Sequence, residues 1–477
     1  MSRRFAKTSN IVKLIFFIVS LIGVCACRVG PNYTAAPTMI IPENYKEAHV
    51  DWKKTKPLDA CHKGAWWQVF NDEALNALAV KINISNQNIV MAEAQYRQAQ
   101  AVIEQNRASL FPLGGLTANT ARQKNITFID NTKLYTKQFV TLDTLSLSAS
   151  WEPDLWGGVR RLIEANTAVT KASEAMLENT RLSMQASLLQ YYFQLHALDI
   201  AQQYLNTNNT NYKKLLNIVK NQYAAGTASR LEVLQAENQV NVAQAAALDN
   251  GVNRAQYEHA IATLLGLSPA QFTIKANARL LKIPTVPAQI PSTLLERRPD
   301  IAAAERQVAA ANANIGVAIA GFFPNFSLNA LKGIESNHIA TIFSAPAHMW
   351  SMGAGVAGNL IDGGLNTAKT KAARASFDAA VANYRQTVLT AFQEVEDNLA
   401  AVRILSAESI IQHEIVKSAE ASLQVIMNQY ENGVANFAAV LNAMLSVDMA
   451  RQTAADVHSN RLLATVALIK ALGGGWN

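Results

Sequence analysis

Two long stretches of the chain carry an uninterrupted helical pattern. Residues 159–225 and 365–432 contain neither glycine nor proline and are rich in Ala, Leu, Gln, Glu and Lys, which favour helices. A single helix through either stretch would be about 100 Å long at 1.5 Å per residue, more than a globular domain needs. The polar cluster at residues 206–211 is the weakest part of the first stretch, and a kink there would shorten the straight span.

Four short segments outside those stretches alternate instead with a period of two residues, the pattern of β-strands. In the clearest one, residues 144–151, leucine, alanine and tryptophan face away from threonine and serine. The others lie around residues 116–122, 325–329 and 350–359. One apolar face opposite a small or polar face fits transmembrane strands between lipid and water. Half-buried strands of a soluble sandwich would alternate in the same way.

The order of these elements occurs twice, about 207 residues apart, which predicts an internal duplication. The matching sites are Phe111-Pro112 with Phe323-Pro324, Leu155-Trp156-Gly157-Gly158 with Ile361-Asp362-Gly363-Gly364, Tyr223 and Gly226 with Tyr430 and Gly433, and Leu265-Gly266 with Leu472-Gly473. Each repeat is predicted to give a helix, two strands and a long helical hairpin.

The N-terminus has the form of a secretory signal. Residues 1–26 hold four basic residues and no acid, followed by an apolar run too short to span a bilayer. The run ends in Val24-Cys25-Ala26-Cys27, and a small residue just before a cysteine resembles the processing site of bacterial lipoproteins. We predict Cys27 as the lipidated first residue of the mature chain. Cys25 is the alternative, and a plain secreted protein is the other one.

These features divide the chain into four parts: a signal peptide at residues 1–26, a lipid-anchored extended segment at 27–71, and repeats at 72–285 and 286–477. Without the four basic residues of the signal, 38 basic residues stand against 35 acidic ones, so the mature chain is nearly neutral. Because no long basic run remains, nucleic-acid binding has little support. Cys61 and the candidate lipid site are the cysteines left, too few for a disulfide framework or a metal site.

No catalytic pattern stands out. The glycines between Gly353 and Gly358 match a dinucleotide fingerprint in letters, but no βαβ pattern surrounds them, so a strand face of small residues is expected. Pro299 and Asp300 fit ordinary helix initiation, and Trp66 and Trp67 fit packing better than sugar stacking. The chain is not expected to be an enzyme or to need a cofactor beyond the lipid.

Four strands cannot close a barrel, and open sheet edges are not tolerated in lipid. Bacterial barrels begin at about eight strands. If the strands are transmembrane, the chain needs copies of itself, and a symmetric ring is the simplest closure. The pattern does not fix the number of copies.

Several motifs resemble the outer-membrane factors of the TolC superfamily, in particular the OprM/NodT-like lipoproteins of multidrug efflux. The resemblance covers nearly the whole mature chain. It rests on Cys27-Arg28-Val29-Gly30-Pro31-Asn32-Tyr33, Trp66-Trp67-Gln68-Val69-Phe70-Asn71-Asp72, Arg297-Arg298-Pro299-Asp300-Ile301, Phe322-Phe323-Pro324 and Leu155-Trp156-Gly157-Gly158.

The resemblance implies an α+β membrane protein that forms a homotrimer. Four strands from each chain would build a 12-stranded transmembrane β-barrel, continued by a long periplasmic α-helical barrel. It also implies a place in the outer membrane of a Gram-negative bacterium, with a periplasmic adaptor (membrane fusion) protein and an inner-membrane RND-type transporter as partners.

The same resemblance places the periplasmic tip at the two Tyr-x-x-Gly turns, formed by Tyr223 with Gly226 and Tyr430 with Gly433. Glycine there has a sufficient structural reason, because a tight helical reversal uses positive φ. The resemblance adds adaptor docking and the closed gate at these turns.

The residues after the two turns differ. Arg230 and Glu232 in the first correspond to Phe437 and Ala439 in the second. Three copies of Glu232 around a pore would favour cations, while the alternatives are a solvated helix acid or a pair with Arg230. At Asn442 relatives often carry a charge, and a ring of asparagines could close only by hydrogen bonds.

The function expected is a passive exit duct for drugs and other small toxic compounds. The outer-membrane exit of a type I protein-secretion system shares the fold and is one alternative. A lipid-tethered periplasmic coiled-coil scaffold is the other.

Overall fold

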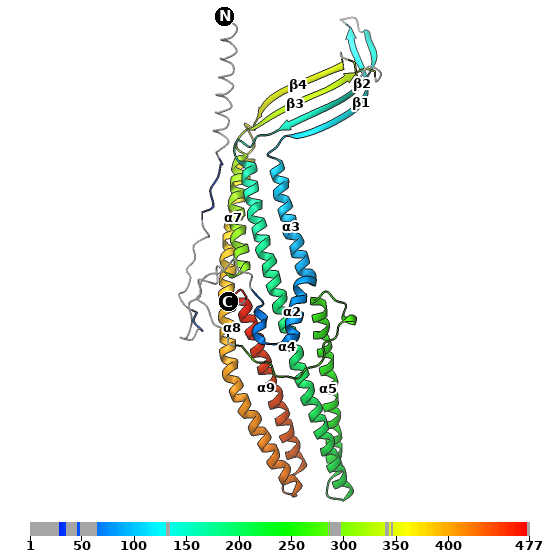
Figure 1. Ribbon diagram of the computed structural model, residues 1–477, viewed down its shortest axis with the longest axis vertical. Coiled ribbons are helices and arrows are strands. Elements are labelled where there is room, and N and C mark those ends of the chain that lie inside the picture. The colour runs from blue at the N-terminus through cyan, green and yellow to red at the C-terminus, as the bar shows by residue number, and fades with distance from the viewer. Residues whose placement is uncertain are drawn as a thin grey trace. The chain divides into compact units, whose positions relative to one another are not determined.

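The computed structural model describes residues 28–34, 45–47, 64–129, 134–284, 286, 297–338, 343–344 and 347–474. The predicted signal peptide, Cys25, Cys27 and Cys61 lie outside these residues. The chain folds into two compact units (Figure 1). Unit 1 comprises residues 1–37, 96–173 and 304–384, and unit 2 comprises residues 38–95, 174–303 and 385–477. Both units draw on both repeats, and the repeat limits stay predictions.

Every long helix predicted from the glycine-free stretches is present and recurs at a fixed interval. The first half contains α4 (Gly158–Ala224) and α5 (Arg230–Leu264), and the second contains α8 (Leu365–Glu431) and α9 (Phe437–Ala471). The paired helices have equal lengths, 67 residues for α4 and α8 and 35 for α5 and α9. The helix α4 continues through residues 206–211 without a break. None of the helices in the described part of the chain is long and apolar enough to cross a membrane.

Unit 1 contains one antiparallel sheet of four strands in the order β1-β2-β3-β4. The strands are β1 (Leu113–Ile129), β2 (Leu134–Trp151), β3 (Asn325–Ser336) and β4 (His348–Ala357). Three of the predicted strand segments lie within β1, β2 and β3, and the fourth, at residues 350–359, overlaps β4 and runs two residues past its end. The strands β1 and β2 pair from Leu113 with Ser150 to Ile129 with Leu134, whereas β2 pairs with β3 only as far as Asp143 with Ser336.

The register places most of the large apolar residues of the four strands on one face of the sheet, because cross-strand partners share a face. Leu116 pairs with Leu147, which pairs with Lys332, which pairs with Trp350. Large apolar side chains on this face are strongly exposed in the chain: Leu116, Leu147, Trp350, Met352 and Val356. We call it the apolar face. The other face carries serines, threonines and glycines, as the alternation predicted.

Helices of unit 1 join the sheet at one end. The end of α3 (Gln87–Ala108) leads into β1, and α7 (Pro299–Ala320) leads into β3. The indole of Trp156 stacks on Phe323 with ring centroids 4.7 Å apart and donates to the Pro324 carbonyl oxygen at 2.8 Å. The repeated Phe-Pro and Gly-Gly sites therefore meet at the junction of sheet and helices.

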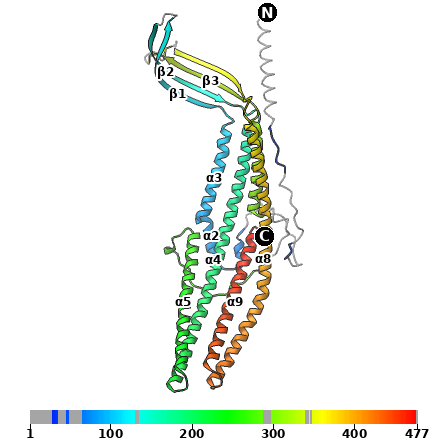
Figure 2. The same cartoon turned by 180° about the vertical axis from the view of Figure 1, so that it is seen from behind.

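Unit 2 has its largest core around the short helix η1 (Trp66–Phe70) and α2 (Glu73–Ser85). Trp66 and Trp67 are buried, and the indole nitrogen of Trp66 donates to Gln185 Oε1 at 2.9 Å. They serve packing, as expected. A second core lies toward the hairpin turns, where α4, α5, α8 and α9 pack together. Both turns lie at the same end of unit 2 (Figures 1 and 2).

Candidate functional site

The two predicted tip turns have the same backbone geometry. Gly226 and Gly433 adopt φ of +79° and +75°, in the left-handed region that favours glycine. Gly226 N donates to the Tyr223 carbonyl oxygen at 3.0 Å, and Gly433 N donates to that of Tyr430 at 3.0 Å. A Cβ added at either glycine would meet no described atom within 4 Å. Backbone conformation alone therefore requires glycine in these turns.

Glu232 takes part in capping the N-terminus of α5. Ser229 caps α5 and accepts from Glu232 N at 3.3 Å, while Glu232 Oε2 accepts from Ser229 N at 2.7 Å, which completes a capping box. A pair with Arg230 was one of the alternatives for Glu232, and the ion pairs among the described residues include none between these two side chains. The Ser-x-x-Glu spacing is legible in the sequence, and the predictions above did not use it.

The start of α9 is capped differently. Asn436 Oδ1 accepts from Ala439 N at 2.9 Å, with no acid in the first turn. Phe437, the counterpart of the exposed Arg230, is 1 % exposed and lies in the core between the hairpins. Asn442 is exposed. The asymmetry of the tips thus combines a buried aromatic anchor on one turn with a charged, capped turn on the other.

Two tyrosines join the first hairpin to the second. Tyr430 Oη donates to Gln222 Oε1 at 2.5 Å, and Tyr212 Oη donates to Asp448 Oδ2 at 2.6 Å. Burial, with a smaller contribution from the Glu232 charge, raises the pKa of Tyr430. Burial also raises the pKa of Asp448, although the hydrogen bond from Tyr212 opposes that shift. Burial also raises the pKa of Tyr212, so both phenols remain protonated donors at neutral pH.

Each hairpin also has an ion pair of its own. Lys220 on α4 pairs with Glu237 on α5 at 3.0 Å, and Arg451 on α9 pairs with Glu420 on α8 at 2.6 Å. These pairs are partly exposed, so each contributes roughly 0–1 kcal/mol. The helices within a hairpin are joined mainly by apolar packing, and near the turns the two hairpins are linked by the two tyrosine hydrogen bonds and the core that contains Phe437.

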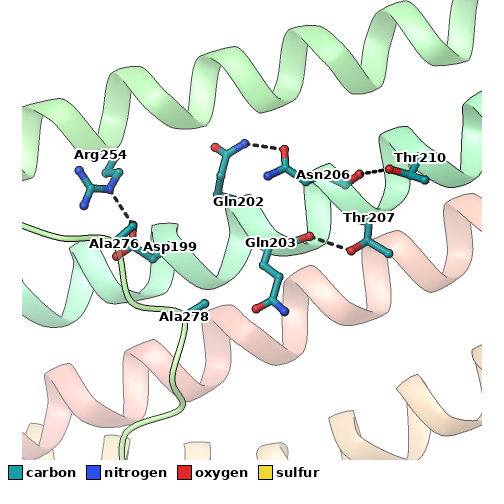
Figure 3. A pocket seen from close by; sticks show the side chains of 9 residues that line it. All are labelled: Asp199, Gln202, Gln203, Asn206, Thr207, Thr210, Arg254, Ala276 and Ala278. Atoms are coloured by element: carbon teal, nitrogen blue, oxygen red, sulfur yellow. Dashed lines mark hydrogen bonds and ion pairs between the residues drawn. The ribbon is translucent and has the colours of Figure 1, made fainter.

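Two depressions lie along the hairpins away from the turns. A polar groove of about 480 Å³ is lined by amides and hydroxyls of α4, by Arg254 and by the segment after α5 (Figure 3). Arg254 Nε donates to Asp199 Oδ1 at 2.7 Å and its Nη2 donates to the Ile274 carbonyl oxygen at 2.8 Å, which fixes that segment on the hairpin. Asp199 Oδ2 accepts from Asn277 N. The groove therefore has a structural role, because its bonds hold the segment after α5 against the hairpin.

A larger groove of about 730 Å³ lies between α4, α5 and α9. Asp448 lines it together with further polar residues of the three helices, among them Asp249 and Asp456. Across the described residues, no group of three or more histidine, cysteine, aspartate or glutamate side chains could hold a metal ion.

The segment that follows Cys27 is tied to the helices of unit 1. Arg161 on α4 is 1 % exposed; its Nε donates to the Val29 carbonyl oxygen at 3.0 Å, and its Nη2 donates to the Gly30 carbonyl oxygen at 3.0 Å and to Asn32 Oδ1 at 2.8 Å. Nη1 donates to Glu164 at 2.9 Å. We call residues 28–34 the strap.

Further contacts hold the strap on α7. Tyr33 Oη donates to Glu305 Oε1 at 2.6 Å, and Asn312 Nδ2 donates to the Pro31 carbonyl oxygen at 3.1 Å. A Cβ on Gly30 would lie 2.5 Å from the Cα of Gly316, so the two backbones touch where they cross. The strap was part of the motif noted in the sequence, but its partner Arg161 was not predicted.

Comparisons with known proteins agree on one family. The family model described as "Outer membrane efflux protein" matches residues 78–267 and 290–474. The chain is similar to the pyoverdine export outer membrane protein OpmQ of Pseudomonas aeruginosa, with 31% identity over 467 residues that cover 96% of this chain and 97% of the relative. It is also similar to the cation efflux system protein CusC of Escherichia coli, with 27% identity over 97% of this chain and 99% of the relative.

Solved structures give the same result. The outer-membrane channel OprN superposes with a TM-score of 0.84 at 28% identity, covering 94% of this chain and 100% of that one. The open-state MtrE outer membrane channel of Neisseria gonorrhoeae superposes with a TM-score of 0.79 at 24% identity, which shows a shared fold. The fold class that the family resemblance implied is confirmed.

Proposed function

Because this chain belongs to the outer membrane efflux protein family, it is an outer-membrane component of an efflux system, and we propose that it is the passive exit duct. The observation that carries the proposal is the tandem plan, in which a four-stranded sheet with one apolar face is joined to two long helical hairpins. In this proposal the chain itself supplies no energy, and transport is driven by a partner.

The sheet supports assembly from three copies. Its edge strands β1 and β4 each pair on one side within the described sheet, and such edges must be covered in lipid. A symmetric homotrimer would give twelve strands, enough to close a barrel. The helical hairpins of the three chains would then line a duct into the periplasm.

The names of the relatives support a duct without its own cargo site. They include export of pyoverdine, of cations and of toluene. Cargoes of such different chemistry suggest that selection belongs to the pump. The partners we propose are a periplasmic adaptor protein and an inner-membrane RND-type transporter, and the cargo of this chain is a small toxic compound.

We assign the gate and adaptor contact to the tip residues Tyr223, Gly226, Arg230, Glu232, Tyr430, Gly433, Phe437 and Asn442. Opening would separate the two hairpins at the tip, which breaks the Tyr430 to Gln222 hydrogen bond. Phe437 would stabilise the closed state, because its buried ring holds the two turns together. The exposed Tyr223, Arg230 and Asn442 are available to a partner.

We also propose that Cys27 carries the lipid. The strap begins at the next residue and is fixed by the buried Arg161, so an acyl chain on Cys27 would be held beside the helices of unit 1. The test is metabolic labelling with a clickable fatty acid followed by mass spectrometry of the N-terminal peptide. Label on Cys27 that is lost in Cys27→Ala supports the site, whereas label on Cys25 overturns it.

Planar bilayers test the duct itself. Purified protein should give discrete ion conductance, and Tyr430→Phe, which removes the hydroxyl but keeps the buried ring, should raise the open fraction. Phe437→Leu should act in the same direction. Tyr384→Phe, which alters a tyrosine of unit 1, serves as a matched control and should behave as wild type. Silence of the wild type and of both tip variants would exclude the duct.

A further inference from the structure

The hairpin of β1 and β2 extends beyond the rest of the sheet. Pairing between β2 and β3 stops at Asp143 with Ser336, while β1 and β2 continue to Ile129 with Leu134. Residues 121–129 and 134–142 therefore form a two-stranded ribbon, which we call the hairpin extension. It lies at the end of the strands away from the junction with the helices.

A cation and aromatic cluster occupies the extension on the apolar face. Lys124 pairs directly with Phe139, and Arg122 stands two residues before Lys124, so all three share that face. The Arg122 guanidinium carbon lies 5.4 Å from the centroid of the Phe139 ring, and Lys124 Nζ lies 5.7 Å from it. Phe139 is 62% exposed, and both cations are exposed.

Arg122 and Lys124 both lie over the ring of Phe139, and no acidic side chain among the described residues pairs with either cation. Neither Arg122 nor Lys124 takes part in an ion pair within the part of the chain that the structure describes. The nearest acid on this face is Asp143, which is buried and accepts from Thr120 Oγ1 at 2.7 Å. Because aligned cations repel one another, an anion between them would be stabilised.

The cluster follows an apolar band along the same face. Toward the helices the face presents Leu116, Leu147 and Met352, all strongly exposed. Basic residues next to an aromatic ring, beyond such a band, are typical of the boundary between hydrocarbon and headgroups. The order along β1 is therefore that of a strand leaving a membrane.

On this basis we propose that Arg122, Lys124 and Phe139 form a binding site for the phosphate groups of a lipid in the outer leaflet, a phosphorylated glycolipid. The inference rests on the proposed placement of the sheet in the outer membrane. The guanidinium can hold a phosphate through two parallel hydrogen bonds, and the ammonium adds a point charge. Phe139 packs against the lipid beside its headgroup. A zwitterionic lipid would bring its own cation against these charges and bind less well.

Native mass spectrometry of the full-length protein tests the site. The probes are diphosphoryl lipid A, phosphatidylglycerol and phosphatidylcholine, each titrated in detergent. We expect lipid A to bind most tightly and the double variant R122Q/K124Q to weaken it at least tenfold. The charge-conserving variant R122K/K124R should retain most of the binding.

The control is K213Q/K214Q, which removes two exposed lysines from α4 far along the chain from the sheet. It should leave lipid A binding unchanged. Equal binding by wild type and R122Q/K124Q would overturn the site, and a preference for phosphatidylglycerol would overturn the assignment to the outer-leaflet glycolipid. Bilayer conductance of R122Q/K124Q should stay normal, so loss of the lipid site is distinguishable from failure of the proposed duct.

Discussion

Replacing Arg161 with methionine should release the strap from unit 1. Methionine keeps an unbranched apolar stem of similar length beside Gly316 but donates no hydrogen bond. Arg161 donates three hydrogen bonds to the strap, to the Val29 and Gly30 carbonyl oxygens and to Asn32 Oδ1. The variant therefore removes these three hydrogen bonds, while the ion pair of Arg28 with Glu164 on α4 and the packing of the helix are largely retained.

The magnitude follows from those three bonds. A hydrogen bond contributes about 1 kcal/mol net, and the acceptors lie in a partly exposed segment where water can replace the arginine. We expect local opening of the strap to become easier by about 2 to 3 kcal/mol. That corresponds to a rise in the opening equilibrium of roughly 30- to 160-fold. The contacts to Glu305 and Asn312 remain, so the strap should loosen without leaving the protein altogether.

Hydrogen exchange measured by mass spectrometry reads this opening directly, because the Val29 amide donates to the Trp156 carbonyl oxygen in the closed state. Exchange of the peptide that contains residues 28–34 should accelerate, while exchange in α9 should not. The control is Arg181→Met, which breaks an exposed pair with Glu178 on the same helix. If the strap exchanges at the wild-type rate in R161M, the contacts of Arg161 do not hold it.

Outcomes for four further variants follow from the hairpins. Gly226→Ala should destabilise the tip by about 1 kcal/mol, because a φ of +79° is unfavourable for alanine. Gly251→Ala within α5 should instead stabilise the hairpin by about 0.5 to 1 kcal/mol, because alanine favours a helix and its Cβ would meet no described atom within 4 Å. Hydrogen exchange near each site checks both, and it should become faster in the first variant and slower in the second. Burial raises the pKa of Asp448 above its ordinary value of 3.8, so its protonation stabilises the fold fully below about pH 3.8, and this stabilisation is lost as the pH rises through the folded-state pKa. Asp448→Asn should flatten that pH dependence in exchange of α9. Tyr212→Phe should raise the pKa of Asp448 further, which shifts the same transition to higher pH.

Much of the architecture could be predicted because helices and strands leave a short-range pattern in the sequence. The absence of glycine and proline fixed the two 67-residue helices, and the two-residue alternation located all four strands. The polar cluster at residues 206–211, the weakest part of the first helical pattern, lies within α4, and its side chains hydrogen-bond to the helix, as Thr210 does to the Asn206 carbonyl oxygen. Continuous hydrogen bonding there preserves the helix.

The residues of the tip could be predicted from the sequence only in part. The glycines and the repeat offset were clear from spacing, and the Ser229 to Glu232 box was available to sequence reasoning but was overlooked. The burial of Phe437 was not predictable from its alignment with Arg230, because burial depends on which hairpin packs against it. The hydrogen bond from Tyr430 to Gln222 joins residues 208 positions apart, and no local pattern announces such a pair.

The sequence by itself determined the elements, their duplication and the apolar face of each strand, since these follow from short-range periodicity and backbone preference. The tertiary structure decided which residues meet. It set Arg161 on the strap, placed Phe437 in the core between the hairpins and carried Arg122 and Lys124 past the end of β3 to share the ring of Phe139. The physical reason is that hydrogen bonds, burial and charge pairing depend on distances in space, and long helices and strands bring together residues far apart in the chain.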